Sequence, residues 1–119
     1  MPAGNLTYRR GELRWVRLDP TVGAEAKKTR VCLILQNNTM NQYGLLTVVM
    51  PLRPGRKEAP YAVNIEPTQE NGLDRERFLD VGQIRSVDGS RVLGLLGVLE
   101  DDYWDKIKEA LDIVLGFRL

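Results

Sequence analysis

Hydrophobic and polar residues alternate with a two-residue period, or merge into short apolar runs, over most of this chain. Segments of this kind, bounded by glycine, proline and asparagine, are typical of β-strands. The apolar run Val31–Leu35 predicts a strand in the middle of a sheet, because both of its faces are apolar. The pattern as a whole predicts six strands: Glu12–Leu18, Val31–Gln36, Leu45–Leu52, Tyr61–Ile65, Phe78–Ile84 and Val92–Leu99.

The first of these strands departs from strict alternation. Leu13 and Trp15 fall on one face, whereas Val16 and Leu18 fall on the other. Two interpretations stay open: the second half of the strand is covered on both sides, or the strand contains a β-bulge.

From Glu100 the period changes to three and four residues. Acidic side chains occupy the first turns, apolar side chains recur from Tyr103 to Leu115, and Gly116 follows. This pattern predicts an amphipathic helix whose acids lie at its positive end and which a glycine terminates. Short strands followed by one helix predict a mainly β (α+β) fold, a small SH3-like antiparallel β-barrel of about six strands with a C-terminal helix.

Between the second and third strands lies the polar segment Gln36–Gln42, which contains three asparagines. It predicts a flexible loop. The amide of Asn37 is suited to reading the base edges of an unpaired RNA strand, but most asparagine-rich loops are simply turns.

A chain of 119 residues with 43% hydrophobic residues predicts one domain, spanning residues 1–119. The single Cys32 lies in an apolar run, which favours a buried thiol in a reducing compartment. The N-terminus lacks the apolar core of a signal peptide, and no run approaches the roughly 18 apolar residues of a membrane span. We therefore expect a soluble, cytoplasmic protein with no membrane partner.

Charge is distributed unevenly along the chain. Residues 1–57 contain ten Lys and Arg against three Asp and Glu, a balance of +7, whereas residues 58–119 contain seven against thirteen, a balance of −6. Basic side chains gathered on one face indicate a polyanionic partner. The equally weighted alternative is that the two halves interleave in the fold and partly cancel.

The chain contains no histidine, which excludes Ser/His and Cys/His nucleophile pairs and makes a zinc site very improbable. No clustered magnesium motif and no glycine-rich nucleotide motif occurs, so we expect no cofactor and no metal. RNA cleavage stays open, because the substrate's own 2′-hydroxyl can be the nucleophile. The protein then has to move protons and stabilise the extra negative charge of a phosphorane.

Two basic loops are predicted to supply that stabilisation. The first contains Lys27, Lys28 and Arg30, and the second contains Arg53, Arg56 and Lys57. The planar guanidinium of Arg30 matches phosphate oxygens, although its high pKa makes it a poor proton carrier. Glu25, in the same loop, is its natural partner and either orients Arg30 or acts as the base. The competing interpretation is that Arg30 makes a structural ion pair.

Several motifs, in their order along the chain, resemble the MazF/PemK family of toxin endoribonucleases. The resemblance covers nearly the whole sequence and rests on many short matches together: Arg10-Gly11-Glu12 with Trp15, Asp19-Pro20-Thr21-Val22-Gly23 with Glu25, Lys28-Thr29-Arg30, Val48–Leu52, Asn71-Gly72-Leu73-Asp74, Gln83–Asp88 with Arg91, and the closing helix.

This resemblance implies a homodimeric β-barrel with a C-terminal helix. It implies metal-independent, sequence-specific cleavage of single-stranded mRNA, leaving a 2′,3′-cyclic phosphate and a 5′-hydroxyl. It also implies neutralisation by a cognate antitoxin whose disordered, acidic tail occupies the RNA groove.

Arg30 matches the family's catalytic arginine, Glu25 an acid implicated in substrate handling, and Gln83 a glutamine near the groove. Two positions depart from the family pattern: Val31 replaces a proline, and Arg53 replaces a catalytic threonine. An arginine cannot relay a proton as a hydroxyl does, but it can bind the phosphorane. We therefore predict Arg30, Glu25 and Arg53 as catalytic residues, and the following as RNA-binding residues: Lys27, Lys28, Asn37, Arg56, Gln83 and Arg85.

Two alternatives to an active nuclease follow. The related CcdB-type barrel poisons DNA gyrase through a tryptophan-containing tail, whereas this chain ends Gly116-Phe117-Arg118-Leu119. The replacement at Arg53 also allows a barrel that binds RNA or antitoxin without cutting.

Overall fold

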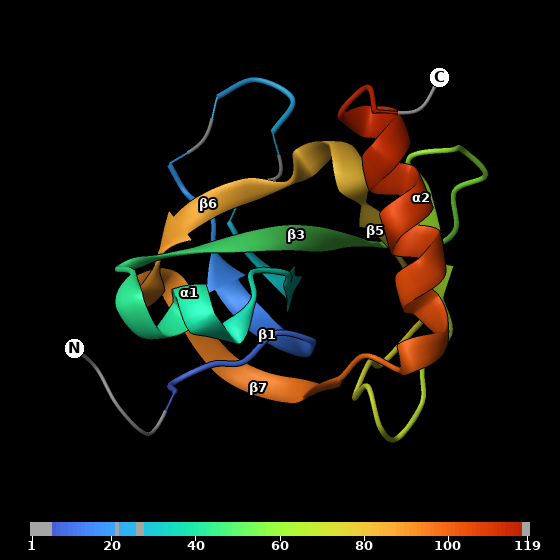
Figure 1. Cartoon of the computed structure of the whole chain (residues 1–119). Coiled ribbons are helices and arrows are strands. Elements are labelled where there is room, and N and C mark those ends of the chain that lie inside the picture. Colours follow the sequence, from blue (N-terminus) through green and yellow to red (C-terminus); the bar gives the residue numbers. More distant parts are fainter. Residues whose placement is uncertain (1–5, 21, 26–27, 118–119) are drawn as a thin grey trace.

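The computed structural model describes residues 6–20, 22–25 and 28–117. Within these residues, seven strands form a sheet in the order β4-β5-β3-β2-β1-β7, with β6 paired to β3, and all the pairs are antiparallel (Figure 1). The strands are β1 (Glu12–Arg17), β2 (Thr29–Ile34), β3 (Leu46–Pro54), β4 (Ala62–Ile65), β5 (Arg77–Asp80), β6 (Arg85–Asp88) and β7 (Val92–Val98).

The central position predicted for the second strand is confirmed. β2 lies between β1 and β3, and its side chains point alternately into two hydrophobic clusters. Val31 and Leu33 belong to the larger cluster, whereas Cys32 and Ile34 belong to the smaller one, which also contains Val16. A strand buried on both faces reads as a continuous apolar run, which explains the sequence pattern.

The irregular pattern of β1 has a counterpart in its pairing with β7. The register shifts between Leu13 and Arg14, and again between Arg14 and Val16. Leu13 belongs to the larger cluster and Val16 to the smaller, so both faces of the strand are also partly covered. Trp15 and Arg17, on the other face of the second half, are exposed, so that half is covered on one face only. The register shifts therefore favour the bulge over a strand half that is covered on both sides.

β3 is long enough to pair with two strands on one side. Its first half, Leu46–Val49, pairs with β6, and its last residues, Leu52–Pro54, pair with β5. A 3₁₀ turn, η1 (Val81–Gln83), separates these two partners, so the strand predicted over Phe78–Ile84 is confirmed as far as Asp80 and is wrong beyond it. The turn is closed by the Ile84 N–H, which donates to the Val81 carbonyl at 3.2 Å and takes this stretch out of the ladder.

The hydrogen-bonded path through the described strands runs from β4 to β7 and does not return to its start. The antiparallel sheet with a C-terminal helix is therefore confirmed, whereas closure into an SH3-like barrel is not.

The flexible loop predicted over Gln36–Gln42 is wrong, because a short helix, α1 (Asn38–Tyr43), occupies most of it. The Asn37 side chain accepts a hydrogen bond from the Met40 N–H at 2.8 Å and thereby caps the helix. Asn41 is buried, and its carbonyl oxygen accepts from Gln36 Nε2 at 2.9 Å and from Thr47 Oγ1 at 2.8 Å. Amides that usually mark a loop here hold a helix against β3.

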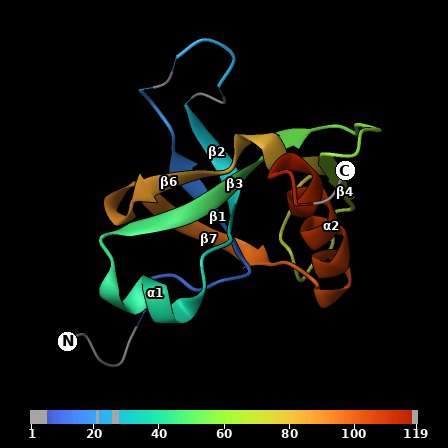
Figure 2. The same cartoon turned by 45° about the horizontal axis from the view of Figure 1, so that its top comes forward.

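The predicted C-terminal helix is confirmed. After a short 3₁₀ turn, η3 (Asp101–Tyr103), α2 (Trp104–Val114) covers one side of the sheet (Figures 1 and 2). It buries Ile107 and Ala110 in the larger cluster. Gly116 has φ +78°, a left-handed conformation that suits glycine and ends the helix. Among the helices of the described residues, none is long and apolar enough to cross a membrane.

Candidate active site

The loop between β1 and β2 is held at its base by arginines from β6 and the turn that follows it. Arg85 Nη1 donates to the Leu18 carbonyl at 3.3 Å, and Arg91 Nη1 donates to the Arg17 carbonyl at 3.1 Å and to that of Asp19. The loop projects beyond the sheet on the side where β6 lies (Figure 2). Arg91 was not among the predicted site residues, although its place in the family motif was a signal for it.

This arrangement creates a cavity of about 310 Å³ between the loop and the segment joining β5 to β6. Gln83 Nε2 donates across it to the Ala24 carbonyl at 3.4 Å. The Glu25 carboxylate accepts the Val22 N–H at 2.5 Å, which orders the tip of the loop. Three predicted site residues, Glu25, Gln83 and Arg85, thus come together, and the cavity lining consists of Ala24, Glu25, Gly82, Gln83, Ile84 and Arg85.

Arg30 and Arg85 lie on the same face of the sheet. Arg30 pairs directly with Val16, and Arg85 pairs directly with Val49. Both valines belong to the smaller cluster, and directly paired residues share a face of the sheet. Arg30 is half-buried and lies within β2, so its predicted position in a loop is corrected: the strand begins at Thr29.

Arg53 also belongs to this face. It lies four residues beyond Val49 on β3, and residues at even spacing share a face. Cys32 of the smaller cluster pairs with Pro51, which lies two residues before Arg53 on β3, so Arg53 shares this face with Cys32 and with Arg30. Arg53 therefore lies on a strand rather than in the predicted second loop, and its Nη1 forms an ion pair with Asp80 Oδ2 at 3.4 Å.

Cys32 lies on the same face, two residues from Arg30. Burial raises the pKa of its thiol to about 12, while the nearby charge of Arg85 acts in the opposite direction. The thiol is therefore protonated at neutral pH and unreactive, in agreement with the buried thiol predicted.

The remaining predicted RNA-binding residues do not gather at the cavity. Lys27 lies outside the described residues. Lys28 is exposed and has φ +65° at the end of the loop, where its carbonyl accepts the Leu18 N–H at 2.8 Å. Asn37 follows β2 and therefore lies at the opposite end of the β1–β2 hairpin, where it caps α1.

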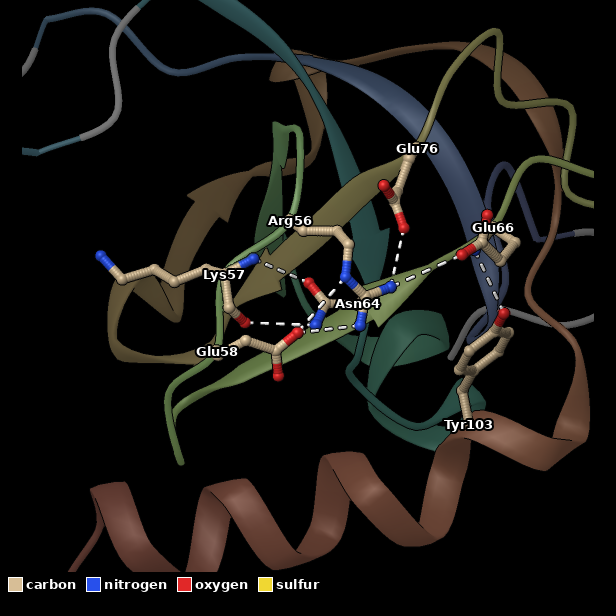
Figure 3. A network of polar contacts seen from close by, with 7 residues as sticks. All are labelled: Arg56, Lys57, Glu58, Asn64, Glu66, Glu76 and Tyr103. Carbon is tan, nitrogen blue, oxygen red and sulfur yellow. Dashed lines mark hydrogen bonds and ion pairs between the residues drawn. The ribbon is translucent and has the colours of Figure 1, made fainter.

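Arg56 lies at the centre of a carboxylate cluster near α2 (Figure 3). It contacts Glu76 at 2.8 Å, Glu58 at 2.9 Å and Glu66 at 3.6 Å. The hydrogen bond from Arg56 lowers the pKa of Glu76, whereas the hydrogen bond with Glu76 raises the pKa of Glu66. The predicted RNA-binding position of Arg56 thus faces acids of the C-terminal half, and here the two oppositely charged halves interleave.

Asp80 was missed because it follows an apolar stretch with no recognisable motif, and only the pairing of β5 with β3 brings it beside Arg53. Among the described residues, no three acidic or cysteine side chains are grouped so that they could hold a metal ion.

The fold is therefore an antiparallel sheet with a C-terminal helix, and one face of the sheet carries three arginines beside the loop cavity. This combination defines a class of small β proteins whose site is suited to the phosphates of a nucleic-acid backbone. The profile of the PemK-like, MazF-like toxins of type II toxin–antitoxin systems matches residues 9–115, and the chain belongs to this family.

Known relatives agree with this assignment. The chain is 29% identical over 112 residues to "Endoribonuclease EndoA" of Bacillus subtilis, covering 93% of this chain and 97% of that protein. It is 32% identical over 112 residues to "Endoribonuclease MazF" of Staphylococcus saprophyticus, covering 92% of each.

Solved structures share the fold. MazF from Deinococcus radiodurans superposes with a TM-score of 0.79 at 24% identity, covering 95% of this chain and 99% of that one. A mycobacterial endoribonuclease, solved in complex with its cognate antitoxin, superposes with a TM-score of 0.77 at 21% identity, covering 95% and 99%. These matches favour the endoribonuclease over the CcdB-type gyrase poison.

Proposed function

We propose that this toxin is an endoribonuclease that cuts single-stranded RNA through the ribose 2′-hydroxyl, without a metal. The relatives that align with more than nine tenths of the chain are named endoribonucleases. The observation that carries the chemistry is the shared face of Arg30, Arg53 and Arg85 beside the Glu25 cavity. Guanidinium groups placed in this way stabilise the negative charge that develops on a phosphorane.

In the proposed reaction the 2′-oxygen attacks the adjacent phosphorus and the bond from phosphorus to the 5′-oxygen breaks. The products are a 2′,3′-cyclic phosphate and a 5′-hydroxyl. The proton of the 2′-hydroxyl passes to a base, for which we propose Glu25, and the leaving 5′-oxygen takes a proton from water or the protonated acid. Arg30 and Arg53 hold the non-bridging oxygens, because an arginine is charged at neutral pH and is poorly suited to carry the proton itself.

Gln83 and Arg85 are proposed to position the RNA. Both line the cavity, and an amide together with a guanidinium offers donors and an acceptor to an unstacked base. Lys27 and Lys28 follow Glu25 by two and three positions in the sequence, and we propose that they contact flanking phosphates.

The decisive experiment incubates the pure protein with mixed-sequence RNA in excess chelator and maps the ends of the fragments. We expect cutting to continue in chelator and to leave cyclic phosphate and 5′-hydroxyl ends. Arg30→Ala is expected to lower the cleavage rate by about 10² or more with the fold intact by circular dichroism. Full activity of this variant would refute the role of Arg30.

A non-catalytic binding protein is the second candidate, favoured by the ion pair that engages Arg53 where the family has a hydroxyl. Binding of the RNA without any cleavage in the same assay would select it.

We also propose that the toxin acts in the cytoplasm as a homodimer. β7 pairs with β1 alone among the described strands, and its Leu93, Leu95 and Val98 are 41%, 54% and 45% exposed. Apolar side chains on a sheet edge are usually covered by a partner. Leu95→Lys is therefore expected to shift the mass in sedimentation experiments from dimer to monomer, whereas an unchanged dimer would exclude this edge.

The proposed protein partner is a cognate antitoxin with a disordered, acidic tail, and the mycobacterial endoribonuclease that shares this fold was solved in complex with its cognate antitoxin. A negative tail fits the arginine face, and association with it should weaken as salt increases.

A further inference from the structure

A second cavity lies at the end of the β1–β2 hairpin opposite the loop. It has a volume of about 240 Å³ and lies between the N-terminal turns of α2 and the residues that flank the hairpin. Arg10 precedes β1 and Leu35 follows β2, so both lie at the end of the hairpin away from the β1–β2 loop. The cavity lined by Glu25 and Arg85 lies at that loop instead. The residues that line it are Arg10, Leu35, Trp104, Asp105, Ile107, Lys108 and Leu111.

The floor of this cavity is apolar and continuous with the hydrophobic core. Ile107 is 1% exposed within the larger cluster, and Leu35, Trp104 and Leu111 pack against that cluster while staying partly exposed. An opening onto the core of this kind accepts an apolar side chain without rearrangement of the fold.

The rim carries cations that have no carboxylate partner among the described residues. The Arg10 guanidinium lies 4.6 Å from the centroid of the Trp104 ring. The backbone N–H of Arg10 donates to Asn38 Oδ1 at 2.8 Å. Lys108 is exposed on the first turns of α2 and has no ion pair within this part of the structure. Asp105 is the single acid of the lining, so the rim is net positive.

We propose that this cavity is an anchor site for the antitoxin, which inserts one large apolar side chain while a neighbouring Asp or Glu pairs with Arg10 and Lys108. The proposal rests on the antitoxin partnership proposed above but not on catalysis. The apolar floor and the cationic rim together match an acidic segment that carries an apolar anchor. An RNA base fits less well, because stacking needs a free aromatic face and Arg10 already covers Trp104.

The chain offers a matched pair of variants for the test. Lys108→Glu reverses a charge on the rim, and Lys106→Glu makes the same change two residues earlier on α2, at the separate cavity that adjoins Arg56. Both residues are exposed, so neither change is expected to disturb the fold. Titration of the full-length toxin with its cognate antitoxin should show about tenfold weaker binding for Lys108→Glu and less than about twofold for Lys106→Glu.

Trp104 supplies a second readout. In a Trp15→Phe background it is the single tryptophan, because the chain contains two. A tryptophan-free peptide covering the antitoxin tail is expected to shift its emission, and alanine in place of the apolar anchor is expected to abolish the shift.

Equal antitoxin affinity of the two lysine variants, or no emission shift at saturating peptide, would overturn the proposal. Weaker RNA binding by Lys108→Glu in an Arg30→Ala background, with antitoxin affinity unchanged, would assign the cavity to nucleic acid instead. RNA cleavage by Lys108→Glu without antitoxin should equal that of the parent. A failure of the catalytic assignment would appear in the cleavage assay of Arg30→Ala, whereas a failure of the anchor site would appear in the antitoxin titration of Lys108→Glu.

Discussion

The Arg53 guanidinium and the Asp80 carboxylate form an ion pair at 3.4 Å that joins β3 to β5 on the face that Arg53 shares with Arg30 and Arg85. The acid holds the arginine in place but also lowers the positive charge that a phosphate would meet. Asp80→Asn is therefore expected to strengthen RNA binding several-fold while lowering kcat by about tenfold, because Arg53 loses its orientation.

Single-turnover rates and filter binding, measured separately on the Asp80→Asn variant, distinguish these two effects. A parallel loss of binding and rate would mean that Asp80 itself contacts the substrate.

The geometry of Arg30, and not only its charge, should matter. Lysine keeps the charge but loses the planar fork that matches two phosphate oxygens. Arg30→Lys is expected to lower kcat by about 10- to 100-fold with little change in the salt dependence of binding. Rates close to those of the parent would mean that a point charge is sufficient at this position.

Asn37 offers a test of two interpretations of one side chain. As the cap of α1 it should contribute about 1 kcal/mol to stability, so Asn37→Ala is expected to lower the free energy of unfolding by that amount. Asn37→Asp preserves the cap and serves as the control.

RNA cleavage by both Asn37 variants should match that of the parent under conditions where the protein is folded. A loss of RNA affinity in Asn37→Asp, with stability unchanged, would restore the base-reading role predicted from the sequence.

Gly72 packs tightly against β7. It has φ +71°, and a Cβ at this position would lie 2.1 Å from the Leu96 carbonyl oxygen. Gly72→Ala is expected to lower the free energy of unfolding by roughly 3 kcal/mol or more. Gly55→Ala is the control: Gly55 has φ +94° with no atom near its Cβ position, so the cost should be only about 1–2 kcal/mol.

Chemical denaturation measures the free energy of unfolding of both glycine variants. Equal losses would mean that backbone conformation, and not the contact with Leu96, sets the requirement for glycine.

Stability should fall in alkaline solution because of Cys32. Its pKa is raised from 9.0 to about 12 by burial, so above pH 9 the unfolded chain loses a proton that the folded chain retains. The contribution of this thiol is fully present below pH 9 and decreases by up to about 1.4 kcal/mol per pH unit above it. Urea denaturation of Cys32→Ala over pH 8 to 11 should show a flatter profile than the parent.

Much of this architecture can be predicted from the sequence, because local pattern and final structure agree. The apolar run from Val31 predicts a central strand, and the spacing from Tyr103 to Leu115 with Gly116 predicts the helix. Helix α1 could not be predicted, since its stability depends on the buried bonds of Asn41 to Gln36 and Thr47. The hydrogen bond from Thr47 forms only once β3 has folded beside this segment.

The site was predictable in part for the same reason. Glu25, Gln83 and Arg85 come together as the family motifs imply. Arg56 is different: it meets Glu66 and Glu76, which follow it by ten and twenty positions, and no local pattern predicts a contact of that kind.

The β1–β2 hairpin lies between the two sites that an antitoxin tail would contact: the cavity beside Trp104 at one end, and the face that carries Arg30 and Arg53 at the other. A strand of six residues spans about 20 Å, so a tail that reaches from the apolar anchor to the arginine face needs at least six or seven extended residues. Two weak contacts joined by such a tail bind more tightly together than either does alone. Once the tail is too short to reach both sites, the affinity of the antitoxin should therefore fall sharply and not in proportion to the residues removed. Proteolytic trimming of that tail would then be enough to free an active nuclease.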